Sequence, residues 1–91
     1  MRESALERQC VRAAQARGWL VRKLKWIGRD GAPDRVFFRG GKVMWLEFKA
    51  PGEEPKPIQL REHKRMRSHG ASVHVVDSWK LFDRIISRYE D

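Results

Sequence analysis

Three charged residues, Asp34, Glu47 and Lys49, stand in or beside two apolar stretches that have the pattern of β-strands. The Gly40-Gly41 pair between these stretches is typical of a hairpin turn. In such a hairpin, the start of the first strand lies beside the end of the second. Because side chains alternate between the two faces of a strand, Glu47 and Lys49 share one face. The pattern therefore predicts two carboxylates and an ammonium group converging at one end of a hairpin.

This set of groups suits a divalent metal ion and an activated water. Hard oxygen ligands select Mg²⁺, for which Mn²⁺ can substitute. We expect Asp34 and Glu47 to bind the metal directly. We expect the two carboxylates to keep Lys49 protonated, which favours positioning the water and stabilising negative charge over acting as a general base.

The spacing of these residues also resembles that of a known nuclease motif. Pro33-Asp34, twelve intervening residues and Glu47-Phe48-Lys49 are similar to the PD-(D/E)XK pattern. The segment GAPDRVFF…VMWLEFKAPGEEPKPIQ resembles the VRR-Nuc branch of that superfamily, in which a G-x-P-D turn, an E-x-K strand and a downstream glutamine recur. The resemblance extends from Glu7 to about Val76, and it implies metal-dependent cleavage of DNA.

The resemblance adds three groups to the expected site. It implies that the backbone carbonyl of Phe48 is a third metal ligand, and that Gln59 orients a water or binds a phosphate. It also implies that Glu7 contributes to the metal site, because A-L-E-R followed by Gly18 resembles the first helix of archaeal Holliday-junction resolvases. The residues alone allow other interpretations: Glu7 as a capping-box partner of Ser4 or a solvated charge, and Gln59 as a surface side chain. Glu3 is the competing acid on this helix.

The periodicity of apolar residues and the turn signals predict seven elements, of which the fifth begins at Pro57 and has Leu60 and Met66 as its apolar anchors. These are a helix over 4–17, strands over 19–26, 34–38 and 43–49, a helix over 57–68, a strand over 72–76 and a helix over 79–89. The implied fold is α/β, a restriction-endonuclease-like core of order α-β-β-β-α-β-α. Its central mixed sheet is flanked by helices, in a single domain over residues 1–91.

The charge of the chain is +8, and it is distributed unevenly. Residues 1–50 hold 12 Lys and Arg against 5 Asp and Glu, whereas residues 51–91 hold 8 against 7. A basic excess concentrated in part of a small domain is typical of nucleic-acid binding. The residues expected to contact DNA are Arg22, Lys23, Lys25, Arg29, Arg61, Lys64 and Arg65.

The composition argues against several other classes of protein. An apolar content of 41% is too high for a disordered chain. Cys10 is the only cysteine, which excludes an intramolecular disulfide, and His63, His69 and His74 lack the spacing of a zinc site and are expected to be structural or surface residues. With neither a signal peptide nor a long apolar run, we expect a soluble cytoplasmic protein. The resemblance implies that the cell is a bacterial or phage-infected one.

Three functions fit these observations. The first is a structure-specific DNA endonuclease that cuts branched DNA such as four-way junctions and acts as a homodimer, as the resemblance implies. The second is the same chemistry on flaps, nicked duplex, single strands or RNA. The third is a non-catalytic basic module that binds nucleic acid. The third is disfavoured, because carboxylates placed near phosphates would repel them.

Overall fold

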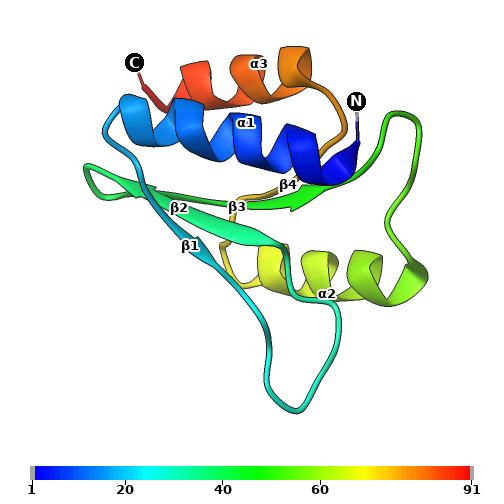
Figure 1. Cartoon of the computed structure of the whole chain (residues 1–91). Coiled ribbons are helices and arrows are strands. Elements are labelled where there is room, and N and C mark those ends of the chain that lie inside the picture. Colours follow the sequence, from blue (N-terminus) through cyan, green and yellow to red (C-terminus); the bar gives the residue numbers. More distant parts are fainter. Residues whose placement is uncertain (1, 91) are drawn as a thin grey trace.

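The computed structural model describes residues 2–90, and the ends of the predicted domain, Met1 and Asp91, lie outside them. The elements are α1 (Glu3–Ala16), β1 (Leu20–Lys23), β2 (Arg35–Arg39), β3 (Lys42–Phe48), α2 (Pro57–Ser68), β4 (Val73–Val76) and α3 (Trp79–Tyr89). This order confirms the predicted α-β-β-β-α-β-α sequence of elements (Figure 1).

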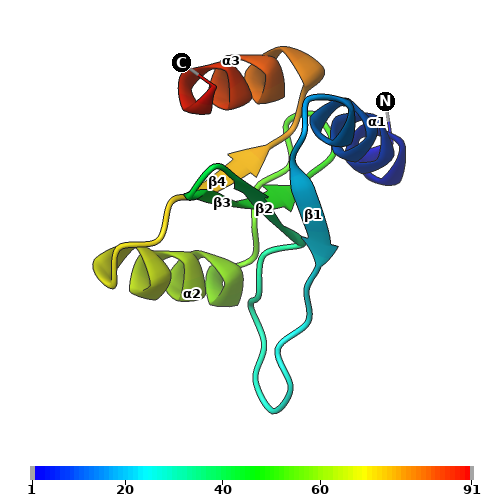
Figure 2. The same cartoon turned by 90° about the vertical axis from the view of Figure 1, so that its left-hand side faces the viewer.

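The four strands form one mixed sheet in the order β1-β2-β3-β4. Strands β1, β2 and β3 pair antiparallel, and β4 pairs parallel to β3. A parallel pair needs a crossover connection, which α2 supplies. Helices α1 and α3 cover one face of the sheet and α2 lies on the other (Figures 1 and 2). Strand β1 therefore lies at one edge of the sheet.

The alternation of side chains along β3 divides the interior into an apolar side and a polar side. Met44, Leu46 and Phe48 are fully buried in the core with residues of α1 and α3. Glu47 is also buried, but it points to the opposite face, where α2 lies. One strand therefore serves both the core and a buried polar site.

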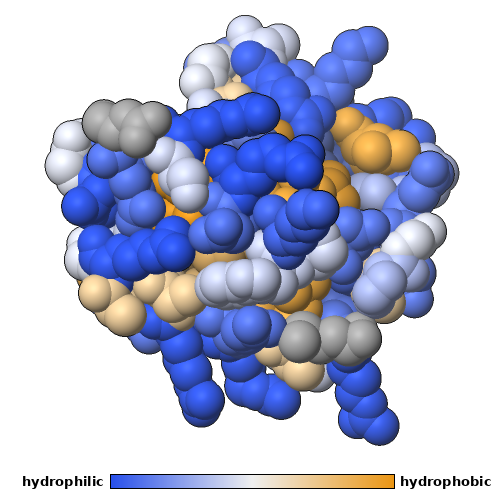
Figure 3. All heavy atoms as spheres, turned by 90° about the horizontal axis from the view of Figure 1, so that it is seen from above, coloured by the Kyte–Doolittle hydropathy of each residue, from blue (hydrophilic) through white to orange (hydrophobic). Residues whose placement is uncertain are grey.

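The outer face of α1 and α3 is mostly hydrophilic, with smaller apolar areas between the charged side chains (Figure 3). Arg17, at the end of α1, links this helix to α3. It pairs with Asp83 at 3.3 Å and with Glu90 at 3.3 Å. Within residues 2–90, no helix is long and apolar enough to cross a membrane.

Two predictions about helix ends and anchors are wrong. Helix α1 begins at Glu3 with Arg2 as its N-cap and has no side-chain cap, so Ser4 and Glu7 form no capping box. Glu7 instead contacts cationic side chains of the sheet. On α2, Leu60 is 47% exposed and does not anchor the helix. The helix turns Glu62 and His63 inward, because the sheet face beneath it carries polar groups.

Strand β1 is shorter than predicted. It ends at Lys23, although Leu24 N still donates a hydrogen bond to Asp34 O at 3.0 Å. Beyond that point the chain leaves the sheet and projects beside α2, returning at Asp34 (Figures 1 and 2). The apolar alternation in residues 24–26 therefore belongs to a loop that packs on a helix.

Candidate active site

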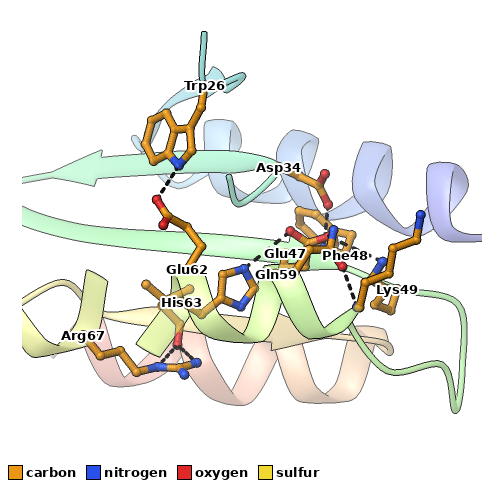
Figure 4. Close-up of polar contacts among 11 residues, drawn as sticks. Trp26, Asp34, Glu47, Phe48, Lys49, Gln59, Glu62, His63 and Arg67 are labelled. Atoms are coloured by element: carbon orange, nitrogen blue, oxygen red, sulfur yellow. Dashed lines mark hydrogen bonds and ion pairs between the residues drawn. The ribbon is translucent and has the colours of Figure 1, made fainter. Parts of the chain in front are cut away.

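The hairpin of β2 and β3 brings Asp34 to the end of β3. Arg35 pairs with Leu46, so the residue before β2 lies beside the residues that follow Leu46. Asp34 Oδ2 accepts a hydrogen bond from Phe48 N at 2.7 Å (Figure 4). This contact holds the carboxylate of Asp34 at the Glu47-Phe48 peptide.

Glu47 is 1% exposed, and its carboxylate is held from two elements. Gln59, in the first turn of α2, donates from Nε2 to Glu47 Oε2 at 3.0 Å. Lys49 Nζ lies 3.6 Å from the same oxygen, and its side chain is 12% exposed. The backbone at Lys49 is itself fixed, since its N–H donates to Val76 O at 2.9 Å. The two strands and α2 thus set the position of this carboxylate.

Gln59 also ties the site to the loop that precedes α2. Its Oε1 accepts a hydrogen bond from Lys56 N at 2.9 Å, while its Nε2 binds Glu47. Pro57 is the first residue of the helix, as predicted, and its missing N–H is no loss there. Gln59 is therefore not the surface side chain that its sequence position alone allowed.

The electrostatics of Asp34 are unfavourable for a bare carboxylate. Burial raises its pKa to about 6, and Glu47, Glu7 and Glu3 add to this rise, while the Phe48 N–H opposes it. A carboxyl group in this situation gains from a nearby cation, which would offset both the desolvation and the repulsion. A positive charge near Asp34 would therefore lower the pKa of this carboxyl group.

The donor set fits a hard cation that keeps part of its water shell. Across residues 2–90, no group of three or more His, Cys, Asp or Glu side chains is close enough to hold a metal ion. This excludes a closed zinc site of protein side chains in that part of the chain. Mg²⁺ is commonly bound by one or two carboxylates with several waters, and Asp34 and Glu47 can supply two.

Glu7 lies in electrostatic range of Asp34 but is engaged by cations. Its Oε2 accepts from Arg35 Nε at 2.6 Å and from Lys23 Nζ at 3.2 Å. Its predicted role at the metal stays a prediction, and so does the choice between Glu7 and Glu3. Both acids belong to α1, and both raise the pKa of Asp34.

Two residues at the site were not expected from the sequence. His63 is fully buried on α2, with Nε2 3.7 Å from Glu47 Oε1. Glu62, its neighbour, is also buried and accepts a hydrogen bond from Trp26 Nε1 at 2.7 Å (Figure 4). A helical spacing of four residues between Gln59 and His63 was the available signal, because it places both on one face.

The loop over residues 24–33 is fastened to α2. Glu62 pairs with Arg29 at 3.4 Å and with Arg65 at 3.6 Å, in addition to its bond with Trp26. Gly31 has φ +97°, and a Cβ there would lie 2.8 Å from Glu62 Cβ. Only glycine allows this close approach of the loop to the helix.

The seven basic residues predicted to contact DNA are all exposed. Arg29, Arg61 and Arg65 come together around a cavity of about 220 Å³ between the loop and α2, which Asp30, Ile58 and Glu62 also line. Lys23 is paired with Glu7, and Arg22 donates to the carbonyl of Val21. The structure therefore gathers three of the seven, Arg29, Arg61 and Arg65, at one place.

The fold and the buried carboxylate of Glu47 beside Lys49 have the features of a nuclease domain. A solved structure described as a "VRR_NUC domain" superposes with a TM-score of 0.88 and 40% identity, covering 96% of each chain. A phage protein, "Putative nuclease p44" of Acyrthosiphon pisum secondary endosymbiont phage 1, is 43% identical over 82 residues, 89% of this chain and 88% of its own length. No family model matches the chain. On these similarities the chain belongs to the VRR_NUC family and is a nuclease.

Proposed function

We propose that the chain is a Mg²⁺-dependent endonuclease that hydrolyses phosphodiester bonds in branched DNA, such as four-way junctions. The observation that carries this proposal is the buried Glu47, which Gln59 and Lys49 hold by the same oxygen. Lys49 and Gln59 engage only Oε2, and the other oxygen of this buried carboxylate, Oε1, has no hydrogen-bond partner among the described residues, which leaves it available to a metal ion. The nuclease relatives support the reaction class.

Asp34, Glu47 and the backbone carbonyl of Phe48 would hold the metal, and Glu7 would contact it through a bound water molecule. Bound Mg²⁺ would supply Lewis-acid stabilisation of the phosphate and lower the pKa of a water molecule. Gln59 fixes the orientation of Glu47 through a hydrogen bond of 3.0 Å. The Lys49 ammonium group would stabilise the negative charge that develops on the phosphate.

The substrate surface is proposed to read DNA shape through the phosphate backbone. Lysine and arginine contacts to phosphates fix the position of a protein on DNA without reading its sequence. The cavity shared by Arg29, Arg61 and Arg65 suits such a contact. We propose that the protein acts as a homodimer, because paired cuts in two strands of a junction require two sites.

A cleavage panel tests this function. End-labelled four-way junction, flap, splayed arm, plain duplex and single strand are incubated with Mg²⁺, Mn²⁺ or EDTA. Glu47→Ala is compared with Glu53→Ala, which removes an exposed carboxylate from the neighbouring loop. We expect paired, symmetric cuts in the junction alone, abolished by EDTA and by Glu47→Ala but not by Glu53→Ala.

Other outcomes of the panel point to other functions. Cuts in flaps, duplex or single strands would retain the chemistry and replace the branched substrate. Tight junction binding without cleavage in either metal would indicate a binding module. In that case Glu47→Ala should leave binding unchanged or improve it, because a carboxylate near phosphates is repelled.

A further inference from the structure

The tip of the β1–β2 loop carries the most exposed large apolar side chain among the described residues. Ile27 is 98% exposed, whereas the next, Leu20, is 49% exposed. The loop projects from the sheet on the same side as α2 (Figures 1 and 2). Isolated exposed apolar side chains are normal on protein surfaces, so exposure alone assigns no role to Ile27.

The loop contacts α2 on both sides of this tip. Trp26, the residue before Ile27, donates to Glu62 Oε2 at 2.7 Å, and its ring lies 6.4 Å from that of Trp45. On the returning side, Arg29 pairs with Glu62 at 3.4 Å, and Gly31 lies directly against the backbone of α2. The chain therefore anchors both sides of the loop and leaves the apolar tip in solvent.

The surroundings of the tip are cationic. Lys25 and Arg29 flank Ile27 and are exposed, and Arg61 and Arg65 lie beside Arg29 around the shared cavity. Asp30 is the exposed acid of the loop. Glu62 is engaged by Arg29 and Arg65, so its charge is offset. A polyanion is therefore the partner that this charge pattern favours.

We propose that the β1–β2 loop is a wedge that places Ile27 against bases exposed at the branch point of the DNA substrate. This rests on the proposed function, because the loop ends at Asp34, the proposed metal ligand. Proteins insert apolar side chains between base steps and hold the adjacent phosphates with basic residues. Branched DNA exposes base faces where its arms meet, which lowers the cost of such an insertion.

The test measures binding in EDTA, so that cleavage plays no part. A four-way junction carries 2-aminopurine at the branch point, and a plain duplex carries it at a matched position. Ile27→Ser is compared with Leu20→Ser, which removes an exposed apolar side chain outside the loop. Ile27→Ser should weaken junction binding about tenfold and abolish the fluorescence rise on binding. Its affinity for duplex and the behaviour of Leu20→Ser should match wild type.

Three results distinguish a failure of the wedge proposal from a failure of the proposed endonuclease function. If wild type binds the junction and Ile27→Ser binds and fluoresces identically, the wedge is wrong and the endonuclease proposal stands. If Ile27→Ser changes the mass measured by light scattering, the tip contacts a second copy of the chain, which also overturns the wedge. If wild type neither binds the junction in EDTA nor cuts it with Mg²⁺ or Mn²⁺, the proposed function itself fails.

A separate observation concerns the buried His63. Among residues 2–90, neither ring nitrogen of His63 has a hydrogen-bond partner, and Glu47 Oε1 has none either. Their separation, Nε2 to Oε1, is 3.7 Å (Figure 4). Gln59 and Lys49 hold only the other oxygen, Oε2. A buried imidazole without partners costs free energy, so its position calls for a role at Glu47.

The geometry points to His63 as a positioning residue that sets the orientation of Glu47 when the carboxylate takes up a metal ion. His63 stands one helical turn after Gln59, so α2 presents a donor to each oxygen of Glu47. A small movement of the carboxylate brings Oε1 within hydrogen-bond distance of Nε2. Hydrogen bonds of this kind orient ligands and contribute to metal affinity.

Metal affinity without DNA is the measurement that tests this role. Mn²⁺ binding is measured by calorimetry, together with the unfolding temperature in EDTA, for His63→Phe, His63→Gln and the exposed His69→Phe. His63→Phe should weaken Mn²⁺ binding about tenfold while leaving the metal-free unfolding temperature equal or higher. His63→Gln, which keeps a donor, should recover part of the affinity, and His69→Phe should match wild type.

A purely structural role of His63 predicts the opposite pattern. Both variants at His63 would then lower the unfolding temperature and leave Mn²⁺ affinity unchanged. If His63→Phe does not fold, His63→Gln decides alone: a Mn²⁺ affinity equal to that of His69→Phe, together with a lowered unfolding temperature, overturns the proposal. Absence of Mn²⁺ binding by wild type would refute the metal site and not only the part of His63.

Discussion

Gln59 Nε2 lies 3.0 Å from Glu47 Oε2, and this hydrogen bond joins the first turn of α2 to the end of β3. The two residues belong to elements on different sides of a long loop, and the loop itself is held by Lys56 N donating to Gln59 Oε1. Because Glu47 is buried, the amide supplies a hydrogen bond that water cannot. Gln59 thus connects the fold of α2 to the orientation of the proposed metal ligand.

Replacing Gln59 by alanine should lower activity more than stability. Loss of one donor to a buried carboxylate costs about 1–3 kcal/mol of unfolding free energy. We expect cleavage to fall by about 10- to 100-fold, because the ligand is no longer oriented. Single-turnover rates and urea unfolding measure the two effects. Gln15→Ala, at an exposed position of α1, is the matched control, and equal behaviour of the two variants would contradict the role of Gln59.

Lys49 should matter for the chemical step and not for metal binding. Lys49→Met keeps the length of a side chain that is 12% exposed but removes its charge. We expect the cleavage rate to fall by about 100-fold or more, as for the loss of a group that stabilises transition-state charge. Mn²⁺ affinity should stay equal or rise, since a competing cation near Glu47 is gone. Lys80→Met, exposed on α3, serves as control; a weaker Mn²⁺ affinity in Lys49→Met would assign the lysine a structural part instead.

The pH dependence of stability should report on Asp34. Burial, with Glu47, Glu7 and Glu3, raises its pKa from 3.8 to about 6. The protonated form therefore favours the folded state, so this contribution is complete below pH 3.8 and is lost as pH rises through about 6.

Asp34→Asn removes this titration. In EDTA, we expect wild type to lose about 1–2 kcal/mol of unfolding free energy relative to Asp34→Asn between pH 4 and pH 7.5, after allowing for the partial exposure of the side chain. Denaturant unfolding at a series of pH values gives this difference. A difference that stays flat across the range would show that the pKa of Asp34 is not raised.

Gly31 and Gly28 form a matched pair for testing how the loop packs on α2. Both have positive φ, +97° and +82°, but a Cβ at Gly31 would lie 2.8 Å from Glu62 Cβ and 2.9 Å from Ile58 O, while nothing lies within 4 Å of one at Gly28. Gly28→Ala should cost about 1 kcal/mol of unfolding free energy from backbone strain. Gly31→Ala should cost about 2–4 kcal/mol, since the steric clash adds to the strain. Equal costs would mean that the loop does not rest on the helix as the structure has it.

Local pattern was enough to predict the framework of the site. The alternation of Met44, Leu46 and Phe48 with Glu47 assigned the two faces of β3, and the Gly40-Gly41 turn placed Asp34 beside that strand. These relations depend on strand geometry and a short turn, both of which act within a few residues. The order of elements followed from apolar periodicity and turn signals along the whole chain, and the family resemblance followed from motifs between Glu7 and about Val76.

The partners of individual side chains depended on contacts between distant segments. Glu7 had a sequence spacing suited to a helix cap, yet the docking of α1 on the sheet gave it Arg35 and Lys23. Leu60 had the composition of a helix anchor, yet α2 turned His63 inward, because the face below it presents Glu47. Such choices follow from the free energy of burying whole faces and pairing their charges, which no local pattern contains. Spacing along the chain decided which residues could do chemistry, and the packing of α1 and α2 on the sheet decided which groups surround them.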